Sequence, residues 1–391
     1  SDRCLMNLKK SVSVFGVTGS VGTSTVDILK THADKYCVDA VTAHRNVDAL
    51  AKAARDLGAK CAVIGDPDCF SQLRDALSDT DIEVMSGEDA LVEAASRPSD
   101  IVIAAIVGAA GLKPTLAAIR RGARVGLANK ETLVCAGSLM SREVVTHGAT
   151  LIPVDSEHSA IFQVLEDRAE DQIERILLTA SGGPFRAWSL NEMKSVTRAQ
   201  ALAHPNWDMG AKISIDSATM MNKGLELIEA RHLFPVPEER IEIVVHPQSV
   251  VHSMVEYADG SVLAQLGSPD MRTPIAYALS WPERIKVDVP RLDFATIGGL
   301  NFEAPDIVRF PALRLAREAL QAGGTLPTVL NAANEVAVAA FLGDKIGFLA
   351  IAEIVEDMMD KIGKEDLVDL DQVFATDAMV RRETAARIAA V

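Results

Sequence analysis

The sequence predicts an α/β fold: a parallel sheet with helices on both faces, then an α+β region with a mixed sheet, then a C-terminal helical bundle. Three observations support this prediction. Short apolar runs alternate with helical patterns over the first 155 residues, strand-like runs then follow one another directly, and apolar residues recur at helical spacing beyond Pro311. Alternating strands and helices are typical of parallel sheets, whereas consecutive strands form antiparallel or mixed ones.

The first region contains seven expected strands, each a short apolar run. They cover residues 12–15, 38–43, 61–64, 82–85, 101–106, 125–128 and 151–154. Helical patterns follow the first six, at 21–30, 47–57, 69–77, 88–95, 113–121 and 138–146, and a helix at 160–166 follows the seventh if Asp155 or Ser156 caps it. This spacing predicts a chain of βαβ units.

The second region has a different pattern. We expect strands at 175–180, 241–245, 250–257 and 261–266, a helix within 215–233, and a hairpin turn at Asp259-Gly260. Four prolines between 282 and 311 mark a linker, and helices follow at 312–321, 326–342, 346–362 and 376–389, interrupted at 372–374. The predicted domains are therefore 1–154, 155–281 and 312–391, joined by the linker 282–311.

Charge and cysteine content exclude several functions. The chain has 39 Lys and Arg against 54 Asp and Glu, a net charge of −15. Such a surface repels phosphate backbones and anionic lipid, so we expect no nucleic-acid or membrane partner. The five cysteines include no C-x-x-C pair, which argues against a disulfide framework and a structural zinc site. With no apolar segment long enough to span a bilayer, a cytoplasmic protein is expected.

A glycine motif follows the first expected strand and opens the first helix. Gly16, Gly19 and Gly22 have the spacing G-x-x-G-x-x-G, so the backbone there can turn tightly and approach a pyrophosphate at a helix N-terminus. Glycines also serve ordinary turns in α/β proteins. The position at the first βα turn favours a dinucleotide, and hence a Rossmann-like N-terminal domain.

The end of the second strand indicates which dinucleotide. An acidic residue there would bind the ribose 2′-hydroxyl of NAD, but the segment Ala43-His44-Arg45-Asn46 has none. The guanidinium of Arg45 suits a 2′-phosphate, which favours NADP. The alternative is a solvated arginine on a loop.

Two carboxylates follow the last strand of the first region. In extended chain Asp155 and Glu157 point the same way, at the strand ends where α/β sheets bind ligands. Carboxylates without cysteine describe an oxygen site for Mg²⁺ or Mn²⁺. The alternative is that Asp155 or Ser156 caps the next helix, and from this segment alone the cap is the simpler interpretation.

Further polar residues occur on an expected helix and in three loops. Asn222, Lys223 and Glu226 share one helical face, although Lys223 and Glu226 also fit a surface ion pair. Thr179 to Pro184 form a candidate phosphate nest. The segment 204–210, with Trp207, fits a mobile lid or an ordinary turn equally well. Residues 129–131 add a polar cluster at a strand end, and His246 and His252 are expected to be structural.

Together these segments resemble the 1-deoxy-D-xylulose 5-phosphate reductoisomerase family along nearly the whole chain. Besides the glycine turn, the resemblance is carried by A-A-I-V-G-A-A-G-L at 104–112, L-A-N-K-E at 127–131, P-V-D-S-E-H at 153–158, S-G-G-P-F at 181–185, H-P-N-W at 204–207, K-I-S-I-D-S-A-T-M-M-N-K-G-L-E at 212–226, H-P-Q-S-V-V-H-S-M at 246–254, Q-L-G-x-P-D-M-R-T-P at 265–274 and N-A-A-N-E at 331–335. Motifs of this length in this order are highly specific.

The resemblance implies an oxidoreductase that converts 1-deoxy-D-xylulose 5-phosphate to 2-C-methyl-D-erythritol 4-phosphate in the non-mevalonate isoprenoid pathway. It implies NADPH, a divalent cation (Mg²⁺, Mn²⁺ or Co²⁺) and a cytoplasmic homodimer. The first domain would then bind NADPH, and residues 155–281 would bind metal and substrate.

The resemblance also assigns roles to individual residues. The metal ligands are Asp155, Glu157 and Glu226, and the catalytic residues are Lys130, Glu157 and His204. The sugar phosphate is bound by Lys130, Ser156, Glu157, Ser181, His204, Trp207, Ser217, Asn222, Lys223 and Glu226, of which Ser181, Ser217, Asn222 and Lys223 take the phosphate. The NADPH site is lined by Thr18, Gly19, Ser20, Val21, Arg45, Asn46, Asn129, Glu131 and Gly210.

The chain departs from the family pattern at Val17, Val21, Ala180 and His44, and His44 puts the adenosine end in question. Two other functions fit parts of the sequence. One is a metal-free NADP-linked dehydrogenase, whose turnover would survive chelation. The other is a dinucleotide sensor, which would bind NADPH without oxidising it.

Overall fold

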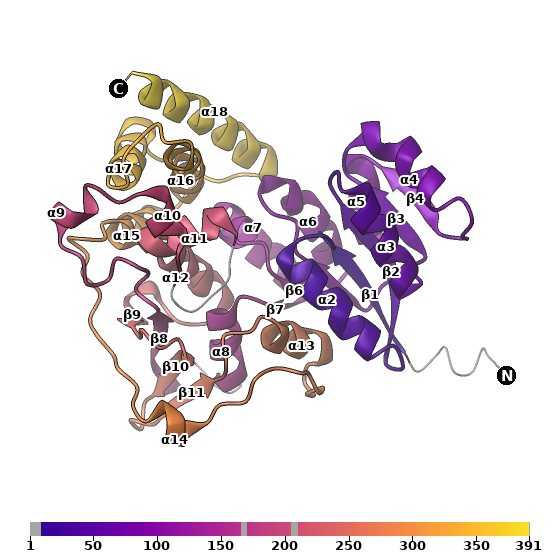
Figure 1. Cartoon of the computed structure of the whole chain (residues 1–391), viewed down its shortest axis with the longest axis horizontal. Coiled ribbons are helices and arrows are strands. Elements are labelled where there is room, and N and C mark those ends of the chain that lie inside the picture. The colour runs from indigo at the N-terminus through magenta and orange to yellow at the C-terminus, as the bar shows by residue number, and fades with distance from the viewer. Residues whose placement is uncertain (1–8, 166–169, 205–209, 391) are drawn as a thin grey trace. The chain divides into compact units, whose positions relative to one another are not determined.

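The computed structural model describes residues 9–165, 170–204 and 210–390. The chain forms two compact units (Figure 1). The first contains the chain up to Thr132 together with Met140–Ser159 and Asp270–Val289, and the second contains Leu133–Leu139, Ala160–Pro269 and the chain from Pro290 onward. No helix in the described ranges is long and apolar enough to cross a membrane.

The first unit is built on a seven-stranded sheet in which every pair of neighbouring strands is parallel, as predicted. Its strands are β1 (Lys10–Phe15), β2 (Tyr36–Ala43), β3 (Cys61–Ile64), β4 (Glu83–Ser86), β5 (Ile101–Ala104), β6 (Arg124–Leu127) and β7 (Thr150–Pro153). The order β4-β3-β2-β1-β5-β6-β7 reverses direction at β1. Ligands of open parallel sheets bind at such a reversal, beyond the carboxyl ends of the strands.

Helices connect these strands, and most lie where they were predicted. They are α2 (Ser20–Thr31), α3 (Val47–Leu57), α4 (Phe70–Ala76), α5 (Glu88–Ser96), α6 (Leu112–Arg120), α7 (Glu131–His147) and α8 (Ser156–Val164). Helix α7 begins at Glu131 rather than at 138, and its backbone leaves helical geometry at Ala136 (φ −129°, ψ 21°), just before Gly137. The helix expected at 160–166 is α8, which begins four residues earlier because Asp155 caps it.

The predicted boundary at 281 does not match the packing. Helix α13 (Arg272–Ser280) packs against α2, β6 and β7 of the first unit. Its buried residues include Ile275 and Leu279, so this helix covers part of the first sheet. Such a long-range return of the chain leaves no local signal in the sequence.

Glycines at the reversal point bring two loops close together. Gly16 has φ +88°, and a Cβ there would lie 2.5 Å from the carbonyl oxygen of Ala105, just after β5. A Cβ on Gly22 would collide with the carbonyl oxygen of Gly16. A larger residue at either position would have to displace backbone, which explains the glycine motif physically.

The second unit contains a four-stranded mixed sheet, as predicted. Its strands are β8 (Ile173–Ala180), β9 (Ile241–Val245), β10 (Val251–Tyr257) and β11 (Val262–Leu266), in the order β11-β10-β8-β9. Strands β8 and β9 are parallel and the other pairs are antiparallel. In the described part of the chain, this unit also contains the helices α9 (Leu190–Met193), α10 (Arg198–Leu202), α11 (Ala211–Thr219), α12 (Met221–Leu233) and α14 (Phe294–Ile297).

The range 215–233, expected to contain a helix, holds all of α12 and the last residues of α11, with a break between them. Met220 adopts φ 65° and ψ 10°, a left-handed conformation that ends α11 and starts α12. A bulky side chain rarely takes this conformation, so the hydrophobic pattern alone gave no reason to expect a break. The break places Asn222 and Lys223 in the first turn of a new helix.

Four helices follow, as the predicted bundle requires: α15 (Ala312–Ala322), α16 (Leu326–Leu342), α17 (Ala350–Ile362) and α18 (Leu370–Ala389). The expected interruption at 372–374 is wrong, because Asp369 caps α18 and that helix runs through these residues. The bundle shares a core with the rest of its unit. Phe348 packs edge-on against Phe185, which follows β8, at 5.1 Å between ring centroids.

Candidate active site

Asp155 lies between β7 and α8 and uses its two oxygens differently. Oδ1 accepts hydrogen bonds from the backbone N–H groups of Glu157 (3.1 Å) and His158 (3.2 Å), so Asp155 is an N-cap. Oδ2 accepts a hydrogen bond from Lys130 Nζ at 2.7 Å. The cap interpretation is therefore correct, and it leaves the second oxygen facing a cation.

Glu226 is held by two residues one turn earlier in α12. Asn222 Nδ2 donates to Oε1 at 2.5 Å, and the ammonium of Lys223 donates to Oε2. The side chains of Lys223 and Glu226 are only 5% and 1% exposed, so the surface-pair alternative is wrong. A buried ion pair gains less than its desolvation costs unless further partners satisfy it, which points to a functional reason for this one.

Asn222 has a further feature that suits a ligand. Within the described part of the chain, its Oδ1 is buried and has no hydrogen-bond partner. A buried acceptor without a donor costs roughly 1–3 kcal/mol. A ligand hydroxyl placed there would recover that energy.

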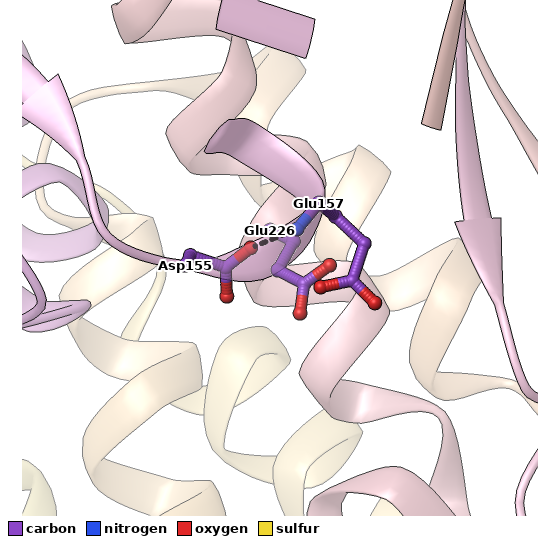
Figure 2. Close-up of side chains that lie close together, drawn as sticks. All are labelled: Asp155, Glu157 and Glu226. Carbon is purple, nitrogen blue, oxygen red and sulfur yellow. Dashed lines mark hydrogen bonds between the residues drawn. The ribbon is translucent and has the colours of Figure 1, made fainter. Parts of the chain in front are cut away.

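The carboxylates of Asp155, Glu157 and Glu226 can hold a metal ion. Their ligand oxygens all lie within 4.8 Å of one another, and Figure 2 shows the three carboxyl groups gathered around one point. Among the described residues no other group of three or more potential ligand side chains is found. Neighbouring carboxylates repel one another unless a proton or cation lies among them, and an all-oxygen donor set suits a hard divalent cation.

The loop after β8 carries the expected phosphate residue Ser181. Gly182 and Gly183 have positive φ, and Ser181 Oγ accepts a hydrogen bond from Gly183 N at 3.2 Å. His204 Nε2 lies 3.1 Å from the same oxygen. A Cβ on Gly183 would lie 2.6 Å from the carbonyl oxygen of Ser217, so the loop packs directly on α11. The structure thus brings Ser181, His204 and Ser217 together.

Part of the predicted site lies outside the described residues. The expected lid, with the substrate-binding residue Trp207, falls in 205–209. Gly210, expected at the NADPH site, is the N-cap of α11. Ser156 donates to Glu157 Oε2 at 2.6 Å and so orients one of the three clustered carboxylates.

The expected pyrophosphate site is the first turn of α2. Thr18 precedes this helix, Gly19 is its N-cap, and Ser20 and Val21 begin it. Its first turn holds no acidic residue and the cap makes no side-chain hydrogen bond, so backbone N–H groups remain available to an anion. The geometry fits a dinucleotide.

Arg45 is an exposed ion-pair partner. Its Nε donates to Asp66 Oδ2 at 2.6 Å, while its side chain is 72% exposed. The backbone N–H of Asp68, together with Arg45, lowers the pKa of Asp66. Sequence reasoning missed Asp66, although its place just after β3, beside β2 in the sheet, was a usable signal. Asn46 caps α3 by accepting a hydrogen bond from Ala49 N.

Asn129 and Glu131 lie at the start of α7. Asn129 Nδ2 donates to the carbonyl oxygens of Ile106 and Gly108, and its Oδ1 accepts from Thr132 N at 2.8 Å. These contacts fix the loop after β5, so Asn129 shapes the expected NADPH site through that loop. Glu131 is buried.

A parallel sheet with a glycine cradle at its reversal point, together with a carboxylate site for a divalent cation, defines a metal-binding oxidoreductase of the dinucleotide-binding class. Comparisons with known proteins identify the family. Models described as 1-deoxy-D-xylulose 5-phosphate reductoisomerase match residues 12–137, and its C-terminal domain matches residues 151–234 and 266–383. The chain belongs to the 1-deoxy-D-xylulose 5-phosphate reductoisomerase family, which confirms the resemblance and the predicted class of enzyme.

Individual relatives cover nearly the whole chain. The reductoisomerase of Rhodospirillum centenum is 59% identical over 97% of this chain and 95% of its own length. The Zymomonas mobilis enzyme, solved in complex with NADPH, has a TM-score of 0.94 at 55% identity over 98% of this chain and 100% of that one. A further reductoisomerase, solved with NADPH, fosmidomycin and magnesium, has a TM-score of 0.91 at 45% identity over 97% and 98% of the two chains.

Replacing one carboxylate tests the metal site. We expect Glu226→Gln to weaken Mn²⁺ binding by at least roughly 10–100-fold, which is the usual effect of mutating a residue that only hydrogen-bonds to a metal ligand. The same substitution should abolish turnover. NADPH affinity should change little. Calorimetric titration with Mn²⁺ measures the first effect, and the exposed Glu174→Gln is the matched control. Wild-type Mn²⁺ affinity in Glu226→Gln would refute the assignment.

Proposed function

We propose that this chain catalyses the NADPH- and divalent-metal-dependent rearrangement and reduction of 1-deoxy-D-xylulose 5-phosphate to 2-C-methyl-D-erythritol 4-phosphate. The observation that carries this proposal is the carboxylate group of Asp155, Glu157 and Glu226. A simple dinucleotide-dependent dehydrogenase has no need of such a group. Homologous structures with bound NADPH and magnesium support it.

The three carboxylates would hold Mg²⁺, Mn²⁺ or Co²⁺, and the first turn of α2 would receive the pyrophosphate of NADPH. When bound, the cation supplies a Lewis acid for the substrate carbonyl and hydroxyl, and NADPH supplies the hydride. The remaining work belongs to the protein: binding, orientation and proton transfer.

Lys130 and Glu157 are the proposed groups for proton transfer. The ammonium of Lys130 is fixed on Asp155 Oδ2 at 2.7 Å and is about four-fifths buried. It can donate a proton or stabilise developing negative charge on a substrate oxygen. Glu157 is oriented by Ser156, and a carboxylate held in this way can accept a hydroxyl proton.

The phosphate group of the substrate would bind in the second unit. Lys223 and Asn222 lie in the first turn of α12, which contains no acidic residue and no side-chain cap. The ammonium of Lys223 and the helix dipole favour an anion at this end. Ser181 and Ser217 add hydroxyl donors, and His204 orients Ser181 through its hydrogen bond.

An absorbance assay tests the function. NADPH oxidation should require both 1-deoxy-D-xylulose 5-phosphate and a divalent cation, and EDTA should abolish it until Mn²⁺ is restored. Turnover that survives chelation would indicate a metal-free dehydrogenase. NADPH binding without oxidation would indicate a sensor.

Arg45 is the proposed reader of the 2′-phosphate. We expect Arg45→Ala to lower the NADPH-over-NADH selectivity by about 10- to 150-fold, since a hydrogen bond to a charged group contributes roughly 1.5–3 kcal/mol. Dissociation constants for both cofactors measure this, with the exposed Arg74→Ala as control. Unchanged selectivity would mean that another group binds the phosphate.

We also propose a homodimer. Strand β11 is an edge of its sheet, and its Val262 and Leu263 are 47% and 39% exposed. Exposed apolar edge strands favour pairing with another chain. Sedimentation velocity should show a dimer that Val262→Lys weakens, whereas the control Val368→Lys, at a valine that is 68% exposed, leaves it intact. A wild-type monomer at micromolar concentration would refute it.

A cytoplasmic location is proposed as well. No disulfide joins the described cysteines Cys37, Cys61, Cys69 and Cys135. Free thiols suit a reducing compartment. Cell fractionation tests this, and recovery of the protein outside the cytoplasmic fraction would contradict it.

A further inference from the structure

A buried polar link joins α11 to α16. Asn334 Nδ2 donates to Asp216 Oδ1 at 2.8 Å, and both residues are buried, at 0% and 1% exposure. Lys212, one turn before Asp216, forms an ion pair with its Oδ2 at 2.6 Å. Asn334 belongs to the motif at 331–335, to which the proposed reaction gives no role.

This polar link costs more free energy than an apolar contact between the two helices would. Its surroundings are apolar, since Ile215, Ala218 and Val338 belong to one hydrophobic core cluster. Burying a carboxylate and an amide costs free energy that only well-directed partners recover, and apolar side chains would pack there without that cost. Within the described residues Asn334 Oδ1 has no hydrogen-bond partner, so the amide does not satisfy both of its ends. The hydrogen bond therefore fixes the orientation of α11 on α16 rather than adding stability.

The hydrogen bond between Asn334 and Asp216 fixes the rotation of α11 about its own axis. Successive residues of a helix point about 100° apart, so anchoring Asp216 to α16 determines where Ser217 points. Ser217 contributes the carbonyl oxygen against which Gly183 packs, with 2.6 Å to an ideal Cβ. A small rotation of α11 would move Ser217 relative to the Ser181 loop.

We propose that Asp216 and Asn334 are positioning residues for binding of the substrate's phosphate group. Neither residue touches the ligand. Asn334 holds Asp216, and Asp216 holds α11 in the rotation that sets Ser217 against the loop of Ser181. This inference rests on the proposed function, because it assumes that Ser181 and Ser217 receive the phosphate.

The same helix offers a matched control. Asn331 is also a buried amide of α16, but it donates to Glu335 of its own helix at 3.1 Å. Glu335 in turn pairs with Arg381 of α18. Asn331→Ala therefore removes a comparable hydrogen bond without touching α11.

The test separates KM from kcat. Asn334→Ala should raise KM for 1-deoxy-D-xylulose 5-phosphate by about 5- to 30-fold, the range for losing one buried hydrogen bond, while kcat and the Kd for NADPH change less than about threefold. Asn331→Ala should lower the Tm similarly and leave KM unchanged. Asp216→Asn removes the charge at the other end of the link without changing its volume, and should also raise KM. It serves as the second variant if Asn334→Ala does not fold.

A double-mutant cycle with Ser217→Ala distinguishes the possible failures. If Asn334 acts through Ser217, the increases in KM are not additive in Ser217→Ala/Asn334→Ala. Additive effects, or an equal rise in KM for Asn331→Ala, would overturn the inference. If Ser217→Ala raises KM and neither Asn334→Ala nor Asp216→Asn does, the inference is also wrong. If Ser217→Ala leaves KM unchanged, the proposed phosphate site itself is wrong.

Discussion

The buried carboxylate of Glu226 is the constraint on which much of the site depends. Its side chain is 1% exposed, and a negative charge at such a position needs cations or hydrogen-bond donors. Lys223 and Asn222 supply them from the preceding turn of α12. The left-handed Met220 begins α12 immediately before these two residues, so both lie in its first turn. The residues that hold Glu226 therefore lie at the end of α12 where the helix dipole favours an anion.

The carboxyl ends of the strands in the first unit set the positions of the other polar groups. The glycine loop follows β1, Arg45 follows β2, Lys130 follows β6 and Asp155 follows β7. Because the strands are parallel, all these residues lie at one edge of the sheet. Backbone sterics at Gly16, rather than side-chain chemistry, bring the loops after β1 and β5 together.

Much of this could be predicted from sequence because the signals are local. Strands of the parallel sheet appear as short apolar runs, and the hydrogen bonds that make His246 structural follow from a strand turn at Pro247. What could not be predicted depends on pairing across long sequence separations. The packing of α13 on the first sheet and the link from Asn334 to Asp216 are both of this kind. The break at Met220 was not predicted for another reason: the hydrophobic pattern of the sequence continues from α11 into α12.

Asp155 shows why competing interpretations of a motif need not exclude each other. The sequence offered a helix cap or a metal ligand, and a carboxylate has two oxygens with about four lone-pair positions. Oδ1 caps α8, which fixes the rotamer, and the fixed rotamer directs Oδ2 toward Lys130. An uncapped aspartate would lose side-chain entropy on binding a cation, whereas this one has already lost it on folding. The structural role therefore prepares the functional one, because the backbone N–H groups of α8 hold the ligand in place.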